Sequence, residues 1–248
     1  ALKAAKEAFP SWSRMEASER AKYISKAGEY IKLRSPEIAK LITRENGKVL
    51  IESYISDIIP VLELIDFYTG TAINYLLREP VKLGIWSFPW RKSYIEFRPL
   101  GTVAVISPWN YPFFLPARDV VAALFAGNCV VLKPSENTPF VAEELKNALT
   151  YAGIPEGVFS LIQGGGETGA FLVGSGVDKI SFTGSVATGR TIMKSTSQLL
   201  TPLTLELGGK DPMIVLDDAD MNFGVQAAIW GAFTNSGQTC SSVERLYV

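Results

Sequence analysis

The first third of the chain has the hydrophobic spacing of amphipathic helices. Within residues 16–33 and 49–75, apolar side chains recur every three or four positions among lysines, arginines and glutamates. This spacing places the apolar side chains along one face of a helix. Residues 1–77 are therefore predicted to be helical.

A different pattern occupies residues 79–97. Polar and apolar side chains alternate over residues 93–97, and Pro80, Gly84 and Pro89 would interrupt any helix in this segment. Alternation of this kind is typical of a strand with two unlike faces. We expect an extended ribbon here.

Beyond residue 100, short runs rich in β-branched residues alternate with helical stretches. The runs lie at 102–106, 129–132, 158–162, 179–182 and 203–205. One intervening helix should begin at Thr138 and Pro139, a cap and a first-turn proline, and end at Gly153. Strands that alternate with helices, some of them apolar throughout, predict an α/β fold with a Rossmann-like, mostly parallel sheet and helices on both faces. Such sheets bind ligands at the carboxyl ends of their strands.

The composition narrows the class of protein. The 248 residues are 47% hydrophobic and 20% charged, which suits one large or two ordinary globular domains. A formal net charge of −1 gives no field that would attract nucleic acid or an acidic membrane surface. No apolar run approaches the roughly 20 residues that span a bilayer, and no signal peptide is visible.

Cysteine content and the chain ends add two expectations. With only Cys129 and Cys240, a disulfide framework is not expected, and a reducing, cytoplasmic location is favoured. The sequence opens in a helical pattern and closes at the start of an apolar strand. We therefore expect it to be a segment of a longer protein.

The chain contains no histidine, although Cys240 stands in a polar SGQTC segment. Ser-His-Asp triads and histidine metal sites are thereby excluded, and no metal centre is predicted. A nucleophilic cysteine usually relies on a histidine to take up its proton, so Cys240 would need another base. Glu206, flanked by Leu205 and Leu207 at a strand end, is the best available carboxylate. The alternative is a glutamate that simply points to solvent.

Two glycine-rich segments follow predicted strands. GGGETG at 164–169 fits the G-x-G-x-x-G dinucleotide fingerprint but lacks the acidic residue expected about 20 positions later, so a plain glycine turn is the alternative. GSVATGRT at 184–191 resembles a phosphate-binding P-loop with arginine in place of lysine. Together with a strand and aspartate at 213–217, it raises the alternative of a P-loop nucleotide-binding protein.

Polar residues also follow the first two predicted strands. Asn110, in SPWNYP (107–112), is either the N-cap of the next helix or an amide donor aimed at an oxyanion. Lys133 and Glu136, in KPSE, form either a solvated turn or a pair that binds ribose hydroxyls. Both segments lie at the sheet edge where ligands are expected.

Taken together, these segments resemble the NAD(P)-dependent aldehyde dehydrogenase superfamily, from the N-terminal helices to the last residue. The resemblance is densest in SPWNYP (107–112), KPSENTP (133–139), FTGSVATG (182–189), LELGGKDP (205–212) and GQTCSSVER (237–245). It implies oxidation of an aldehyde to a carboxylic acid with hydride transfer to NAD(P). The implied domains are a dinucleotide-binding domain at 1–78 and 98–208, an oligomerisation ribbon at 79–97, and the start of an incomplete α/β catalytic domain at 209–248.

The resemblance assigns the catalytic roles residue by residue. Cys240 would attack the aldehyde to form a thiohemiacetal, while Asn110 and the backbone N–H of Cys240 would hold the oxyanion. After hydride transfer, Glu206 would activate the water that hydrolyses the thioester. A nucleophile can manage without histidine if a carboxylate and a positively charged cofactor share its site.

The resemblance likewise implies the cofactor contacts. Lys133 and Glu136 would bind the adenosine ribose, and Ser185 the pyrophosphate. The remaining cofactor-binding positions would be Trp109, Gly164, Gly184 and Gly208. A carboxylate at Glu136 would repel a 2′-phosphate, which favours NAD over NADP.

Substrate choice rests on three residues after Asn110. Tyr111, Leu115 and Arg118 are spaced to share one helical face, which lines the aldehyde tunnel in the family. Arg118 would match the arginine that binds the distal carboxylate of succinic semialdehyde in some relatives; an exterior arginine paired with a carboxylate is the alternative. The only expected partners are a small aldehyde and, for the full-length protein, further copies in a homodimer or homotetramer. A non-catalytic relative and a CoA-dependent acylating relative are the other interpretations.

Overall fold

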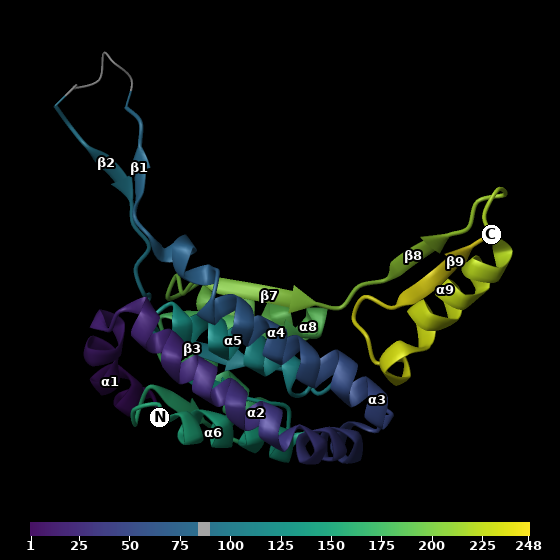
Figure 1. Cartoon of the computed structure of the whole chain (residues 1–248), viewed down its shortest axis with the longest axis horizontal. Helices are drawn as coiled ribbons and strands as arrows, with labels where there is room; N and C mark the ends of the chain where they lie inside the picture. The colour runs from purple at the N-terminus through teal and green to yellow at the C-terminus, as the bar shows by residue number, and fades with distance from the viewer. Residues whose placement is uncertain (84–89) are drawn as a thin grey trace.

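The computed structural model describes residues 1–83 and 90–248, and its centre is a five-stranded sheet (Figure 1). All five predicted strands are confirmed. They are β3 (Thr102–Ile106), β4 (Cys129–Lys133), β5 (Phe159–Leu161), β6 (Lys179–Gly184) and β7 (Leu203–Leu207). Their order is β5-β4-β3-β6-β7, and every neighbouring pair is parallel. The chain order reverses between β3 and β6, which is where doubly wound sheets bind ligands.

Helices cover both faces of this sheet, which confirms the predicted α/β class. The crossovers are α5 (Phe114–Phe125), α6 (Pro139–Ala152), α7 (Gly166–Val173) and α8 (Val186–Thr196). Successive side chains of a strand face opposite sides of a sheet. Accordingly, Val103 and Val105 pack with α5 and α6 in one buried cluster, whereas Ala104 packs with Leu172 and Ile192 of α7 and α8 in another.

The N-terminal segment is helical, as predicted, but with several breaks. Its elements are α1 (Leu2–Arg14), α2 (Ala17–Asn46), α3 (Leu50–Ser53), the π-helical η1 (Tyr54–Ile58), α4 (Ile59–Thr69) and the 3₁₀-helical η2 (Ala72–Leu76). This helical layer packs on the α5/α6 cluster through buried side chains that include Trp12, Ile24 and Ile38. Within it, α2 lies alongside α6 (Figure 1). Within residues 1–83 and 90–248, no helix is long and apolar enough to cross a membrane.

Helix α6 has the predicted boundaries but a different cap. Thr138 occupies the N-cap position, yet its hydroxyl is buried and has no hydrogen-bond partner among the described residues. Instead, the carboxylate of Glu45 at the end of α2 accepts hydrogen bonds from the backbone N–H groups of Phe140 (3.0 Å) and Val141 (2.9 Å). A carboxylate suits the positive end of the helix dipole. The predicted N-cap position of Thr138 is therefore confirmed, but the distant Glu45 side chain accepts the hydrogen bonds that the Thr138 hydroxyl does not.

A two-stranded ribbon projects from one end of the sheet layer (Figure 1). It pairs β1 (Glu79–Val81) antiparallel with β2 (Ser93–Ile95), as the alternation over 93–97 predicts. Gly84 and Pro89, which also supported that prediction, lie outside the described residues.

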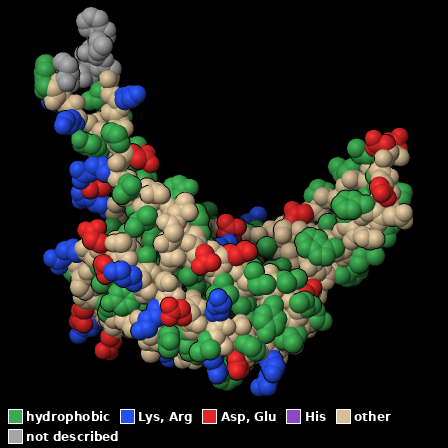
Figure 2. All heavy atoms as spheres, viewed as in Figure 1, with side chains coloured by type: hydrophobic (Ala, Val, Ile, Leu, Met, Phe, Trp, Pro, Cys, Tyr) green, Lys and Arg blue, Asp and Glu red, His purple; other side chains and the backbone are tan. Residues whose placement is uncertain are grey.

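A second arm carries the C-terminal residues. It contains β8 (Asp211–Ile214), α9 (Met221–Phe233), the 3₁₀-helical η3 (Thr234–Gly237) and β9 (Val243–Tyr247), and β8 and β9 form a separate parallel pair. Figure 2 shows hydrophobic side chains gathered over this arm. The large exposed apolar residues of α9 are Met221, Phe223, Val225, Ile229, Trp230 and Phe233.

Candidate active site

The three catalytic candidates border one cavity of about 410 Å³. Asn110 comes from the turn after β3, Glu206 from β7, and Cys240 from the loop between η3 and β9. The cavity lies where the chain order of the sheet reverses, at the carboxyl ends of β3 and β6. Residues from three distant parts of the sequence therefore meet at the expected edge.

Cys240 is exposed and free, and its loop is held from two sides. The backbone N–H of Gly209 donates to the carbonyl of Cys240 at 3.2 Å. The hydroxyls of Tyr111 and Thr239 are hydrogen-bonded at 2.7 Å. The thiol thus has a fixed backbone around it while its sulfur remains open to a substrate.

Asn110 is not a helix cap, because α5 begins only at Phe114 and has no side-chain cap. Its Nδ2 donates to the backbone carbonyl of Gln238 at 2.9 Å. Its Oδ1 is buried and has no hydrogen-bond partner in the described part of the chain. A primary amide carries two N–H donors, so one remains for a ligand. Of the two interpretations left open for this residue, the helix cap is wrong, because the amide donates to Gln238 and not to α5.

Glu206 projects from the edge strand β7, where side chains alternate between the two faces. Leu205 and Leu207 pack into the α7/α8 cluster, so the carboxylate between them emerges on the opposite face, beside the cavity. The residue is exposed. The apolar neighbours therefore do not enclose the carboxylate, which agrees with the alternative that Glu206 points to solvent.

Two of the three substrate candidates line the same cavity. Leu115 is buried and Arg118 is half-buried on α5. Tyr111 precedes the helix, because a residue before proline is disfavoured in the α conformation and Pro112 follows it. Its hydroxyl bonds to the cysteine loop, and it is not among the cavity-lining residues.

Arg118 keeps its charge beside the thiol. Its Nε donates to Asp119 Oδ1 at 2.8 Å. Burial works against the charged guanidinium, but the hydrogen bond to Asp119 and the negative charges of Asp119 and Glu206 outweigh it and raise the pKa of Arg118. The cavity therefore contains a permanent cation as well as a carboxylate.

A neighbouring cavity of about 400 Å³ lies between the sheet edge and helices α7 and α8. Four predicted cofactor residues border it: Trp109, Lys133, Glu136 and Gly184. Trp109 and Gly184 border the thiol cavity too, so the two spaces share a wall. A ligand in one would lie next to a ligand in the other.

Lys133 and Glu136 sit at the mouth of this second cavity. The Lys133 side chain is almost fully buried, and its Nζ donates to the Pro134 carbonyl at 2.8 Å and lies 3.5 Å from Glu136 Oε2. The Glu136 carboxylate accepts a hydrogen bond from the backbone N–H of the same residue. This bond, together with the positive charge of Lys133, lowers the pKa of Glu136. An ammonium has three donors, so this pair retains capacity to bind hydroxyl groups.

The other predicted cofactor residues lie elsewhere. Ser185 and Gly208 border the thiol cavity, and the Ser185 hydroxyl accepts from Thr188 N at 3.1 Å as the N-cap of α8. Gly164 borders neither cavity. It has φ of +148°, and a Cβ there would lie 2.1 Å from Thr168 Oγ1, so this position requires glycine for the turn into α7.

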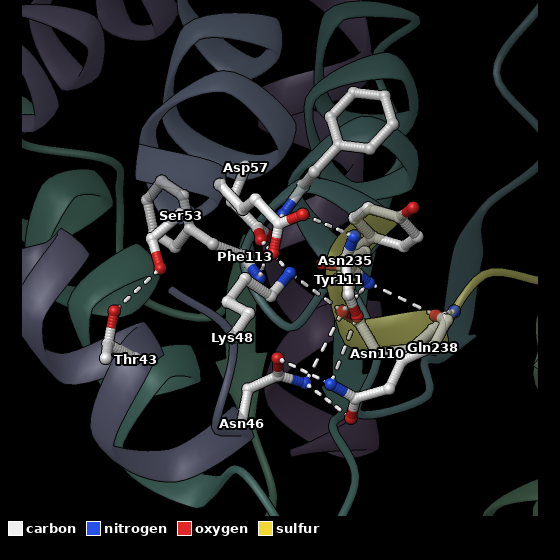
Figure 3. Close-up of polar contacts among 12 residues, drawn as sticks. Thr43, Asn46, Lys48, Ser53, Asp57, Asn110, Tyr111, Phe113, Asn235 and Gln238 are labelled. Atoms are coloured by element: carbon white, nitrogen blue, oxygen red, sulfur yellow. Dashed lines mark hydrogen bonds and ion pairs between the residues drawn. The ribbon is translucent and has the colours of Figure 1, made fainter. Parts of the chain in front are cut away.

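Three residues that were not predicted from the sequence hold the Asn110 turn in place (Figure 3). Lys48, Asp57 and Asn235 are all fully buried around it. One signal was available for Asp57: it lies four and eight positions before the buried Val61 and Ile65, on the apolar stripe of its helix. A charge on such a stripe needs a partner.

Comparison with known proteins gives a consistent result. The model of the aldehyde dehydrogenase family matches residues 1–248. The 4,4'-diapolycopene aldehyde oxidase of Methylomonas sp is 41% identical over 237 residues, 96% of this chain and 45% of that protein. The betaine aldehyde dehydrogenase of Vibrio vulnificus strain CMCP6 is 39% identical, aligned over 100% of this chain and 50% of its own length. The chain spans about half the length of these curated relatives.

A solved structure agrees in three dimensions. The NAD⁺ complex of the aldehyde dehydrogenase from Bacillus cereus superposes with a TM-score of 0.93 at 34% identity, covering 99% of this chain and 50% of that one. The family match overturns the P-loop alternative, and the topology explains why. Residues 184–189 do form a strand-to-helix turn, but Asp217 follows β8, which pairs with β9 outside the main sheet. A magnesium-binding aspartate must lie beside its phosphate loop.

Proposed function

This chain belongs to the aldehyde dehydrogenase family, and we propose that the whole protein oxidises an aldehyde to a carboxylic acid with NAD as the hydride acceptor. The observation that carries this proposal is the convergence of Cys240, Glu206 and Asn110 on one cavity. That cavity adjoins the second one through Trp109 and Gly184. A thiol, an amide donor and a carboxylate around one space are the groups that a covalent cysteine mechanism requires.

The reaction begins at the sulfur of Cys240. Sγ attacks the aldehyde carbon, the thiol proton passes to Glu206 or to solvent, and the carbonyl oxygen becomes an alkoxide. The free N–H of the Asn110 side chain and the backbone N–H of Cys240 hold that oxyanion. Removing one such donor typically costs about 10²–10³ in kcat. NAD, held by the residues of the second cavity, would supply the hydride acceptor. Loss of the hydride from the thiohemiacetal carbon would leave a thioester on Cys240.

Glu206 completes the cycle. Its carboxylate takes a proton from water, the resulting hydroxide attacks the thioester carbon, and Cys240 leaves as the thiolate when the carboxylic acid is released. The exposed position of Glu206 gives that water direct access. A base in this position supports hydrolysis over transfer of the acyl group to CoA, because an acylating enzyme does not need it.

The second cavity suits a dinucleotide. Lys133 and Glu136 retain hydrogen-bonding capacity for the adenosine ribose, and the negative charge of Glu136 opposes a 2′-phosphate. NAD is therefore the proposed cofactor, with NADP as the alternative. Ser185 at the start of α8 is the proposed pyrophosphate contact, since helix N-termini bind anions. The remaining proposed contacts are Trp109, Gly164, Gly184 and Gly208.

The proposed substrate carries a carboxylate, as succinic semialdehyde does. Arg118 supports this choice, because its charged guanidinium borders the same cavity as Cys240. Its one carboxylate partner, among the described residues, is Asp119, through Nε. Leu115 supplies an apolar wall for the methylene groups between the two ends of such a substrate, and Tyr111 packs behind the cysteine loop.

The domain assignment and assembly are also proposals. Residues 1–78 and 98–208 form the dinucleotide-binding domain, and 209–248 begin the catalytic domain. The ribbon at 79–97 mediates a homodimer or homotetramer, which its exposed Val81, Tyr94 and Ile95 favour. Both cysteines are free, which supports a reducing location such as the cytoplasm.

The decisive experiment follows NADH formation by the whole protein with a panel of aldehydes. Wild type and Cys129→Ala should both turn over, whereas Cys240→Ala should form no NADH and accumulate no acyl-enzyme in mass spectra. Turnover by Cys240→Ala would refute the covalent mechanism. An absence of turnover by the wild type with every aldehyde, with and without CoA, would favour the non-catalytic interpretation.

A further inference from the structure

Lys48 and Asp57 form an ion pair of which both side chains are fully buried, with Nζ 2.7 Å from Oδ2 (Figure 3). Lys48 directly follows Gly47, the left-handed C-cap of α2, and Asp57 lies in the π-helical turn η1. Desolvating two charges costs more than their attraction returns unless further hydrogen bonds satisfy them. The further hydrogen bonds of Lys48 and Asp57 therefore indicate the structural role of this ion pair.

Both charges hold the segment between Asn110 and α5. Lys48 Nζ donates to the backbone carbonyl of Asn110 at 2.9 Å. Asp57 Oδ1 accepts from the backbone N–H groups of Phe113 at 3.0 Å and Phe114 at 2.9 Å. The cation thus holds one end of the turn and the anion the other. These contacts fix the position of the Asn110 backbone, from which the side-chain amide extends.

Asn235 connects the same turn to the cysteine loop. It is fully buried and has φ of +56°, a left-handed conformation that asparagine tolerates better than most residues. Its Nδ2 lies 3.0 Å from the Asn110 carbonyl and 3.1 Å from the Gln238 carbonyl. Its own backbone N–H donates to Glu52 Oε1 at 2.7 Å. The side-chain amide and the backbone N–H of Asn235 together therefore join the turn, the cysteine loop and the N-terminal helices.

The carbonyl oxygen of Asn110 is the common point of these contacts. It accepts from Lys48 at 2.9 Å, from Asn235 at 3.0 Å and, more weakly, from Asn46 Nδ2 at 3.4 Å. A carbonyl has two lone pairs, so this acceptor is saturated. A turn that needed only to be buried would not require a charged donor and two amides on one oxygen.

We propose that Lys48, Asp57 and Asn235 are positioning residues that fix the distance between the Asn110 amide and the Cys240 thiol. None of the three borders the thiol cavity, so each acts through Asn110 or the cysteine loop. The inference rests on the proposed oxyanion role of Asn110. A displacement of about 1 Å in a catalytic group costs roughly 100-fold in rate, which is the effect expected when one of these residues is removed.

The test compares two reactions of Cys240 in the whole protein. Aldehyde oxidation builds an oxyanion, whereas alkylation by iodoacetamide is a displacement that builds none. Asn235→Gly removes the bridging amide but keeps a residue at ease with positive φ. It should lower kcat by about 100-fold, leave KM within about threefold and leave the alkylation rate within about twofold. The matched control is Ser53→Ala, which removes a partly buried hydrogen bond to Thr43 (3.0 Å) between α2 and α3 and should keep the wild-type kcat.

A double variant separates positioning from general damage. If Asn235 acts through Asn110, then Asn110→Ala with Asn235→Gly should be no slower than Asn110→Ala alone. Lys48→Met should follow the same rule, and Lys48→Arg, which keeps a donor, should recover part of the rate. Additive losses, or alkylation accelerated in step with the loss of kcat, would overturn the inference. If Asn110→Ala itself kept full activity, the proposed function would fail instead, which is a different outcome.

Discussion

Asn110 donates through its side-chain amide to the backbone carbonyl of Gln238 at 2.9 Å, across 128 positions of the sequence. Gln238 lies two residues before Cys240, so the proposed oxyanion donor and the nucleophile share one hydrogen-bonded unit. Their separation is set by the protein before a substrate arrives. Preorganisation of this kind is what gives an oxyanion donor its effect.

Replacing Glu206 by glutamine should separate the two halves of the reaction. Because the carboxylate acts on water after hydride transfer, Glu206→Gln should still give a burst of one NADH per site, followed by a steady state slower by about 10²–10⁴. Stopped-flow absorbance at the NADH band measures both phases. Loss of the burst would mean that Glu206 is needed before the thioester forms, and restoration of turnover by CoA would favour an acylating enzyme.

The two cysteines should differ sharply in reactivity. Burial raises the pKa of Cys129 to about 11, whereas Cys240 is exposed. The thiolate is the reactive form, so at pH 8 iodoacetamide should modify one cysteine per chain, identified by peptide mass spectrometry as Cys240. Rapid labelling of Cys129 in the folded protein would contradict this.

The same pKa shift predicts a pH effect on stability. The pKa of Cys129 in the folded protein lies above its ordinary value of 9.0. The contribution of the neutral thiol to the free energy of unfolding is therefore present below pH 9.0 and is lost as the pH rises toward about 11. Over that interval, the urea midpoint of the wild type should fall more than that of Cys129→Ala. Parallel curves for the two proteins would show that the thiol is not the cause.

Arg118→Leu tests the proposed substrate class. If the guanidinium binds a substrate carboxylate, its loss should lower kcat/KM for succinic semialdehyde relative to propanal by about 10- to 100-fold. The same ratio for Arg118→Lys should lie between those of the wild type and Arg118→Leu, because a lysine keeps the charge but not the forked geometry. An unchanged ratio would leave Arg118 as the partner of Asp119 and nothing more.

Glu136→Gln tests the choice of cofactor. Removing this negative charge should raise kcat/KM for NADP relative to NAD by about tenfold, because the 2′-phosphate is no longer repelled. The matched control is Glu143→Gln, a half-buried glutamate of α6 paired with Lys146 and absent from the cofactor cavity. A ratio that does not move, or that moves equally in both variants, would remove Glu136 from the ribose site.

Lys48→Met should destabilise the fold as well as slow the reaction. It leaves the Asp57 carboxylate buried without its counter-charge, which costs about 3–5 kcal/mol in the free energy of unfolding. Adding Asp57→Asn should recover part of the loss, because the unpaired charge is gone. Equilibrium urea denaturation of the whole protein measures both.

The deficit of Lys48→Met should also depend on pH. Burial raises the pKa of Asp57, and the Lys48 ammonium opposes that rise. Without the ammonium, the folded state of the variant holds the Asp57 proton more tightly. The stability that this proton gives the variant is therefore present at low pH and is lost as the pH rises through the folded pKa of Asp57. The variant should therefore be closer to wild type at pH 5 than at pH 8.

The strands could be predicted because their signal is local. Residues 102–106 and 129–133 are buried on both faces, and β-branched runs suit such positions regardless of what surrounds them. The fold class followed from their alternation with helices. The cap of α6 could not be predicted, because Glu45 is brought to it by the packing of α2 on α6, which no local pattern encodes.

The candidate site also has one part that the sequence predicts and another that depends on the tertiary fold. Cys240 and Glu206 could be named from residue type and resemblance, but their meeting depends on β7 lying at the sheet edge and on the chain returning from β8 through α9. The buried Lys48–Asp57 pair could be predicted only in part. Asp57 lies on an apolar stripe, but Lys48 lies in the loop after α2, and the other partners of the pair, around Asn110 and Phe113, lie more than 50 positions away.

The links between Asn235 and Glu52, and between Gln238 and Asn110, span 183 and 128 positions. A chain emerging from the ribosome completes the helices, the parallel sheet and the Asn110 turn before either link can form. The proposed oxyanion donor Asn110 is therefore synthesised 130 residues before the proposed nucleophile Cys240. A growing chain that stops short of residue 235 carries neither contact and no Cys240, so the proposed site can form only after the parallel sheet has been synthesised.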